Sequence, residues 1–186
     1  MNGFRTILID PPWPQTNSGK RKREKGDHGD ESLPYPTMSL HDILMLPVGQ
    51  LAAPDCHLWL WTTNQFLGEG IQLMRAWGFK YLAPIHMIKP SGVGNYFVAR
   101  TQTLLMGYKE QCKFEGARYL PNIIEVKSVP RHSEKPTQTY EYIESVSQPA
   151  RLELFARKKR DGWSVWGNEV ESDISIETQE LNEIGS

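Results

Sequence analysis

The sequence lacks the features that mark membrane, secreted and zinc-binding proteins. None of its apolar runs approaches the ~20 residues needed to cross a bilayer, and its N-terminus shows no secretory signal. It has two cysteines, Cys56 and Cys112, with no metal-ligand spacing around them. We therefore expect a reduced, cytoplasmic protein with no bound metal and no membrane contact.

No sign of charge dominates the whole chain, since 21 Lys and Arg face 22 Asp and Glu. After Asn168, however, there are six acidic residues and no Lys or Arg, which leaves 16 acidic against 21 basic residues, a charge of +5, in residues 1–168. A basic body with an acidic end suggests a polyanionic partner such as nucleic acid. We expect one folded domain over residues 1–172 and an acidic, flexible tail over residues 173–186.

Short apolar runs alternate with segments of helical periodicity along the chain. We expect strands at 4–9, 57–62, 81–88, 103–108, 123–126, 152–156 and 163–165, helices at 39–46, 65–77 and 139–146, and a loop at 92–95. Continuously apolar strands separated by helices are typical of a parallel sheet that is covered on both faces. This pattern predicts an α/β fold with a mostly parallel central sheet flanked by helices, and such sheets bind ligands at the carboxyl ends of their strands.

The most unusual motif, Asp10-Pro11-Pro12-Trp13, directly follows the first expected strand. It can be interpreted as a simple turn, because Asp and Pro are common turn residues. It also suits chemistry on the exocyclic amine of a nucleobase, which is a poor nucleophile because its lone pair is delocalised into the ring. The Asp10 carboxylate and the Pro11 carbonyl would accept the two amine hydrogens and free the lone pair. Trp13 would stack on the flipped-out base.

Further motifs follow in a characteristic order over residues 7–169. They are Tyr35-Pro36-Thr37-Met38-Ser39, Leu58-Trp59-Leu60-Trp61-Thr62, Trp77-Gly78-Phe79, Lys89, Ser133-Glu134-Lys135-Pro136, Glu153-Leu154-Phe155-Ala156-Arg157 and Gly167-Asn168-Glu169. In this order the chain resembles the DPPW-type N6-adenine methyltransferases, which include the catalytic subunit of the eukaryotic messenger-RNA adenine methyltransferase. The resemblance implies a Rossmann-like methyltransferase fold that uses S-adenosylmethionine.

The resemblance also implies roles for individual residues. The catalytic turn would comprise Asp10, Pro11, Pro12 and Trp13, and the residues expected at the cofactor are Asp10, Ser133, Lys135, Glu153, Phe155, Arg157, Asn168 and Glu169. Lys135 would pair with the carboxylate of the cofactor. Asn168 and Glu169 would lie on its ribose side.

The expected partner is nucleic acid, with DNA favoured over RNA. Substrate contacts are expected from Trp13, Tyr35, Lys89, Gln102 and the basic run Lys20, Arg21, Lys22, Arg23 and Lys25. That run would contact phosphates, although such runs are also common as solvated charge. Two alternatives stay open, an RNA adenine methyltransferase and a non-catalytic nucleic-acid-binding partner subunit. A homodimer or a complex with a second subunit stays open as the active form.

Overall fold

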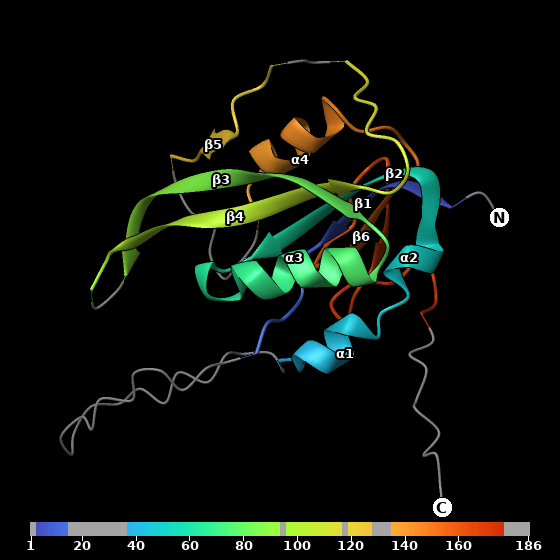
Figure 1. Ribbon diagram of the computed structural model, residues 1–186, viewed down its shortest axis with the longest axis horizontal. Coiled ribbons are helices and arrows are strands. Elements are labelled where there is room, and N and C mark those ends of the chain that lie inside the picture. The colour runs from blue at the N-terminus through green and yellow to red at the C-terminus, as the bar shows by residue number, and fades with distance from the viewer. Residues whose placement is uncertain (1–2, 15–36, 94–95, 117–118, 128–134, 177–186) are drawn as a thin grey trace, which may run out of the picture.

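The computed structural model describes residues 3–14, 37–93, 96–116, 119–127 and 135–176, and one seven-stranded sheet runs through them (Figure 1). In chain order the elements are β1 (Phe4–Ile9), α1 (Leu40–Leu44), α2 (Val48–Leu51), β2 (Ala52–Thr62), the 3-10 turn η1 (Asn64–Phe66), α3 (Leu67–Ala76), β3 (Lys80–Val93), β4 (Ala99–Tyr108), β5 (Ile123–Glu125), α4 (Thr137–Glu144), β6 (Arg151–Leu154) and β7 (Trp163–Trp166). The spatial order is β5-β3-β4-β2-β1-β6-β7.

One strand runs against the rest of the sheet. β4 pairs antiparallel with both β2 and β3, whereas all other neighbouring strands pair in parallel. All the strands except β4 therefore point the same way, which confirms the predicted α/β fold with a mostly parallel sheet. The carboxyl ends of the parallel strands consequently meet at one edge.

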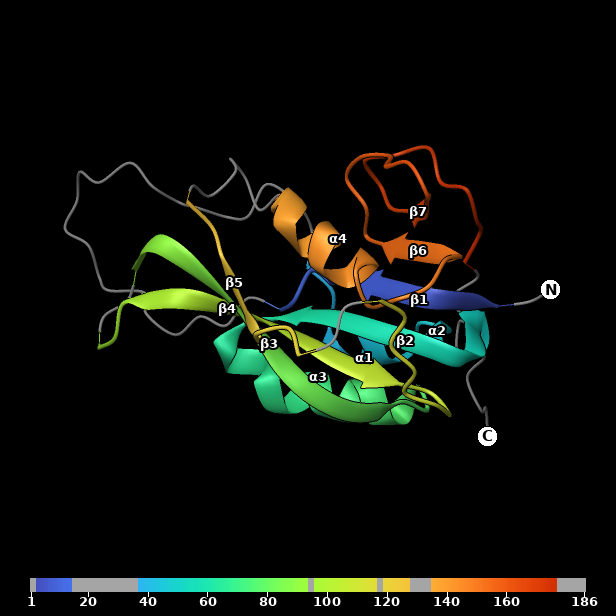
Figure 2. The same ribbon diagram turned by 90° about the horizontal axis from the view of Figure 1, so that it is seen from above.

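Helices cover both faces of the sheet, as the view from above shows (Figure 2). On one face, α1 and α3 pack Ile43 and Met74 against the odd-numbered side chains of β1, Ile7 and Ile9. On the other face, α4 packs Ile143 in the same cluster as Leu8. The alternation of neighbouring side chains between the two faces follows directly from the pleat of a strand.

Local signals placed several element ends correctly. Ser39 caps α1 through a capping box with Asp42, whose backbone N–H lies 3.1 Å from the Ser39 Oγ. Gly78 follows α3 with a φ of +85°, a conformation that glycine adopts without strain. Within the described residues, no helix has the length and apolar character to cross a bilayer.

The predicted loop at 92–95 is wrong at its start, because β3 continues to Val93 and pairs there with Ala99 of β4. Gly92 lies inside this pairing, where an added Cβ would stand 2.2 Å from the Ala99 carbonyl oxygen. The glycine therefore permits close strand approach and does not end the strand. β2 also begins at Ala52, five residues earlier than expected, and α2 was not predicted.

Candidate active site

Strand register brings the predicted residues of four elements to the same edge of the sheet. Ile9 of β1 is level with Leu60 of β2 and with Leu154 of β6, and Leu154 is level with Trp166 of β7. The residues that follow these positions are Trp61, Asp10, Phe155 and Gly167. They form a row across the carboxyl ends of the strands, where α/β sheets bind their ligands.

Asp10 and Lys135 form an ion pair at the centre of this row. The Lys135 Nζ lies 2.8 Å from Asp10 Oδ2, and the Lys135 side chain is only 9% exposed while that of Asp10 is 28% exposed. The same Nζ lies 5.0 Å from the ring centroid of Trp61, a cation–π contact. The Trp61 Nε1–H is buried and has no hydrogen-bond partner among the described residues. Two residues predicted from the sequence 125 positions apart are therefore in direct contact.

The Asp10–Trp13 turn is held in place by the packing and hydrogen bonds of Trp13. Trp13 donates its backbone N–H to the Pro11 carbonyl at 2.8 Å and its Nε1–H to the Trp61 carbonyl at 3.0 Å. Its ring stacks on Phe66 with centroids 5.2 Å apart, and only 9% of the residue is exposed. The geometry gives Trp13 a packing role that holds the turn in place. Stacking of Trp13 on a base stays a prediction.

Glu153 belongs to a buried polar cluster beside Asp10. Tyr140 donates its hydroxyl to Glu153 Oε1 at 2.8 Å, and the guanidinium carbon of Arg160 lies 3.8 Å from the Tyr140 ring centroid. Burial raises the pKa of Glu153 to about 7, and the negative charge of Asp10 acts in the same direction. Burial beside Glu153 likewise raises the pKa of Tyr140, so the phenol keeps its proton and donates it.

Sequence reasoning missed Tyr140 and Arg160 as members of this cluster. Tyr140 was predicted only as part of the apolar side of the helix at 139–146. A buried tyrosine needs a partner for its hydroxyl, and a nearby carboxylate was the signal to look for. That partner, Glu153, comes from another element of the fold.

Four further residues predicted at the cofactor lie at the carboxyl ends of β6 and β7. Phe155 has a φ of +63°, which is rare outside glycine and marks a backbone held by its surroundings, and its ring packs edge-on against Trp166 at 5.3 Å. Arg157 Nη1 lies 3.6 Å from Glu169 Oε1, and Asn168 and Glu169 are both exposed. Their polar groups are therefore accessible at the edge of the sheet.

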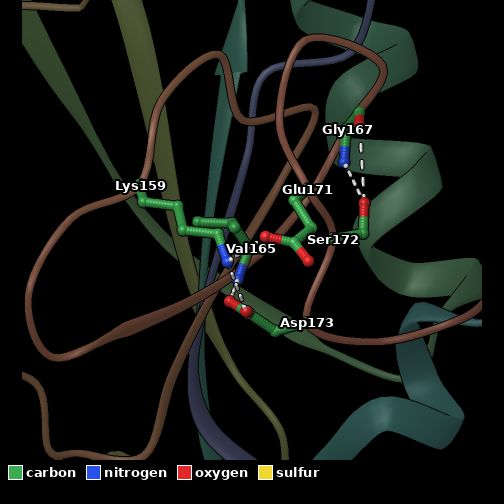
Figure 3. Close-up of polar contacts among 6 residues, drawn as sticks. All are labelled: Lys159, Val165, Gly167, Glu171, Ser172 and Asp173. Atoms are coloured by element: carbon green, nitrogen blue, oxygen red, sulfur yellow. Dashed lines mark hydrogen bonds and ion pairs between the residues drawn. The ribbon is translucent and has the colours of Figure 1, made fainter.

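Figure 3 shows how the turn after β7 is fastened to the body of the protein. Asp173 accepts a hydrogen bond from the Val165 N–H at 2.9 Å and pairs with Lys159 Nζ at 3.2 Å, and Gly167 donates its N–H to Ser172 Oγ at 3.1 Å. Both ends of the segment that carries Asn168 and Glu169 are thus held. The predicted tail begins at Asp173, and its residues 177–186 lie outside the described residues.

The predicted substrate residues are placed only in part. Lys89 was expected at the end of its strand, but β3 extends four residues further, so Lys89 lies inside it. Gln102 is level with Met87. By alternation, Gln102 lies on the same sheet face as Leu104, the face that also carries Trp61. The basic run 20–25, Tyr35 and Ser133 lie outside the described residues.

Comparison with known proteins agrees with this geometry. The MT-A70 family model matches residues 4–169, from the start of β1 to the turn after β7. Over 95% of its length the chain is 31% identical to the type II methyltransferase M.MunI of a Mycoplasma species, and it spans 82% of that protein. It is 30% identical over 90% of its length to the human N(6)-adenine-specific methyltransferase METTL4, and 28% identical over 90% to the N6-methyladenosine RNA methyltransferase MTA1 of Cryphonectria parasitica.

The chain spans only 37% of METTL4 and 52% of MTA1, so these relatives contain much sequence with no counterpart here. The residues matched by the family model contain the whole sheet and the Asp10–Trp13 turn. This match over nearly all of the described fold, together with the relatives' names, places the chain in the MT-A70 family of N6-adenine methyltransferases.

Proposed function

We propose that this chain transfers a methyl group from S-adenosylmethionine to the N6 amine of adenine in DNA. The observation that carries the proposal is the position of Asp10, paired with buried Lys135 at the carboxyl edge of the sheet. Methyltransferases of this family generally use this cofactor, which supplies a methyl group bound to a sulfonium. The specific roles given below to residues of this chain are part of the proposal.

The residues at the edge fit such a cofactor. Lys135 offers a cation for its carboxylate, and Asp10 offers negative charge for its ammonium and sulfonium groups. Glu153, whose pKa is raised to about 7, offers a further carboxyl beside Asp10. The partly buried Arg157 and the exposed Asn168 and Glu169 offer donors and acceptors for ribose hydroxyls. Phe155 and the buried Trp61 provide an apolar wall between the amino-acid end and the ribose end of the cofactor. Ser133 is a further predicted contact, from the segment before Lys135.

At the substrate amine, Asp10 and the Pro11 carbonyl act as the two hydrogen-bond acceptors. The Pro11 oxygen already accepts the Trp13 N–H, but a carbonyl oxygen has two lone pairs and retains one for the substrate. The two contacts localise the lone pair on N6, which then forms the new N–C bond as the C–S bond breaks. The amine proton leaves to solvent past Asp10, whose side chain is 28% exposed. Pro12 fixes the direction of the turn.

DNA is favoured over RNA because M.MunI, of which this chain spans 82%, is named a type II methyltransferase. MTA1 of Cryphonectria parasitica, which is named an RNA methyltransferase, is spanned over only 52%. The residues proposed at the nucleic acid are Trp13, Tyr35, Lys89, Gln102, and Lys20, Arg21, Lys22, Arg23 and Lys25. The basic run would neutralise phosphates on the strand that carries the adenine.

The test is methyl transfer from labelled cofactor to single-stranded DNA, duplex DNA and RNA of matched sequence. We expect label on adenine, with DNA preferred, and no transfer by Asp10→Ala. Far-UV circular dichroism and urea unfolding check that Asp10→Ala is folded. Label that persists in Asp10→Ala contradicts the role of Asp10, and a preference for RNA contradicts the choice of substrate.

A further inference from the structure

The hairpin of β3 and β4 extends past its neighbours in the sheet. The last β4 residue paired with β2 is Thr103, level with Thr62, and the last β3 residue paired with β5 is Ile88. Residues 89–93 and 99–102 lie beyond these points. Figures 1 and 2 both show this part of the hairpin protruding from the end of the sheet. It protrudes at the carboxyl ends of the parallel strands, the edge that carries Asp10.

Large apolar side chains at the tip of this hairpin are almost fully exposed. Tyr96 is 95% exposed, Phe97 89% and Val98 62%. Single exposed apolar residues are ordinary, but three consecutive ones that include two aromatic rings need a partner. Rigid aromatic rings lose little conformational entropy when they are covered, so this tip is well suited to a flat apolar ligand surface.

The charge around the tip indicates the kind of partner. Arg100 is exposed, and its Nε donates a hydrogen bond to the Lys89 carbonyl at 2.9 Å, which holds the side chain along the hairpin. Lys89 lies on the same projecting part. Aromatic rings next to fixed cations are the combination that binds single-stranded nucleic acid, through base stacking and phosphate contact.

The reach of the hairpin matches a substrate at Asp10. Trp61, which is level with the Asp10 row, pairs with Leu104, and Val98 lies six residues before Leu104. At about 3.4 Å per residue this is roughly 20 Å along the hairpin. A nucleic acid strand with 3.4 Å between successive bases covers the same distance in about six steps. The tip therefore reaches bases about six nucleotides along the strand from a target adenine.

We propose that Tyr96 and Phe97 stack on bases about six nucleotides along the strand from the target adenine, with Val98 extending the apolar surface. This inference rests on the proposed function. Bases of an unpaired strand expose their faces to water, and aromatic rings that stack on these faces cover them. Arg100 and Lys89 hold the adjoining phosphates. The hairpin thereby holds the strand at a second point, away from the Asp10 turn.

The test compares the parent chain with the double variant Tyr96→Ala/Phe97→Ala in binding a fluorescent oligodeoxynucleotide that contains adenine. We expect affinity to fall about tenfold or more, since one stacked base contributes a factor of about 5 to 150. The dependence of log affinity on log salt concentration should stay the same, because no charge is removed. The single variant Phe97→Trp, in which Tyr96 is unchanged, should retain the parent's affinity for the oligonucleotide.

Tyr119→Ala is the matched control, because Tyr119 is 100% exposed and precedes the amino end of β5, away from the hairpin tip. It should bind the oligonucleotide like the parent, and both variants should bind S-adenosylhomocysteine like the parent. Unchanged oligonucleotide affinity in the double variant overturns the proposal. If the double variant keeps its affinity for the oligonucleotide but changes from dimer to monomer in light scattering, the proposal is also overturned. The tip is then a contact between two copies of the chain. Failure of the proposed function shows separately, as absence of methyl transfer by the parent chain.

Discussion

The Nζ of Lys135 lies 2.8 Å from Oδ2 of Asp10 and joins the turn after β1 to the segment that leads into α4. The lysine head group is largely removed from water, since its side chain is only 9% exposed. A cation in such a position depends on its counter-ion and on the Trp61 ring face. The pair therefore organises the site before any ligand arrives.

This dependence predicts that Asp10→Ala lowers the free energy of unfolding by about 1–3 kcal/mol, because it leaves a buried cation without its carboxylate. The double variant Asp10→Ala/Lys135→Met should regain most of that loss, since the unpaired charge is gone. Urea unfolding of the parent, both single variants and the double variant closes the cycle. Additive losses in the double variant would show that the pair contributes no coupling energy.

Trp13 offers a second stability prediction. Its buried ring stacks on Phe66, so Trp13→Ala should lower the free energy of unfolding by about 3–5 kcal/mol. Trp13→Phe keeps the stacking and removes the hydrogen bond to the Trp61 carbonyl, and should cost about 1–2 kcal/mol. Thermal and urea unfolding measure both. A stable Trp13→Ala would mean that the ring serves the substrate alone.

The predicted fold and the position of the Asp10–Trp13 turn followed from local sequence. Phe4–Ile9 is β-branched and apolar at its end, Ile7-Leu8-Ile9, and is followed by Asp10 and two prolines, so both the strand and its end could be placed. The contacts between elements could not be predicted from local sequence. Tyr140 and Glu153 lie 13 residues apart in different elements, and only the packing of α4 on the sheet brings them together. Arg160 reaches Tyr140 from a third segment.

The outer part of the β3–β4 hairpin was also beyond local reasoning. The segment Lys89-Pro90-Ser91-Gly92 has turn-forming composition, which predicts a loop. It is extended because β3 pairs with β4 again at Val93, level with Ala99, after the register shift that follows Ile88. Pairing between the strands of a hairpin here overrides the local propensity for a turn.

Gly167 should not tolerate a larger side chain. A Cβ at this position would stand 2.3 Å from the Ala156 carbonyl oxygen. Gly167→Ala should therefore displace the turn that carries Asn168 and Glu169, with a loss of more than about 1 kcal/mol in stability and weaker binding of S-adenosylhomocysteine. Gly68→Ala in α3 is the control, because a Cβ there meets nothing within 4 Å. It should gain about 0.5–1 kcal/mol. Equal effects of the two substitutions would contradict the steric explanation.

The basic run Lys20–Lys25 predicts a specific salt dependence. Replacing its five basic residues by Gln should weaken oligonucleotide binding and reduce the slope of log affinity against log salt by up to about four for duplex DNA. Affinity for S-adenosylhomocysteine should not change. The control variant Lys80→Gln/Lys113→Gln removes exposed positive charge at the amino end of β3 and in the loop after β4. If the control changes the slope of log affinity against log salt by the same amount per charge removed, the effect is due to net charge and not to the basic run.

Glu153 predicts how stability depends on pH. Its pKa rises from 4.5 to about 7 in the folded protein because the carboxyl is buried beside Asp10. Between these two values the unfolded chain has released the proton that the folded protein still holds, so the contribution of Glu153 to stability is largest below pH 4.5 and is lost as the pH rises to about 7. This shift in pKa corresponds to a change of up to about 3 kcal/mol in the free energy of unfolding.

Glu153→Gln removes this titration and leaves an amide oxygen for the Tyr140 hydroxyl. Relative to the parent, the variant should therefore gain stability as the pH rises from 4.5 to 7.5, by a large part of that change. Urea unfolding of both proteins at pH 4.5, 6 and 7.5 measures the difference. Glu125→Gln, at an exposed carboxylate of β5, is the control and should show no such trend. A difference between Glu153→Gln and the parent that stays constant with pH would place the titration of Glu153 outside this window.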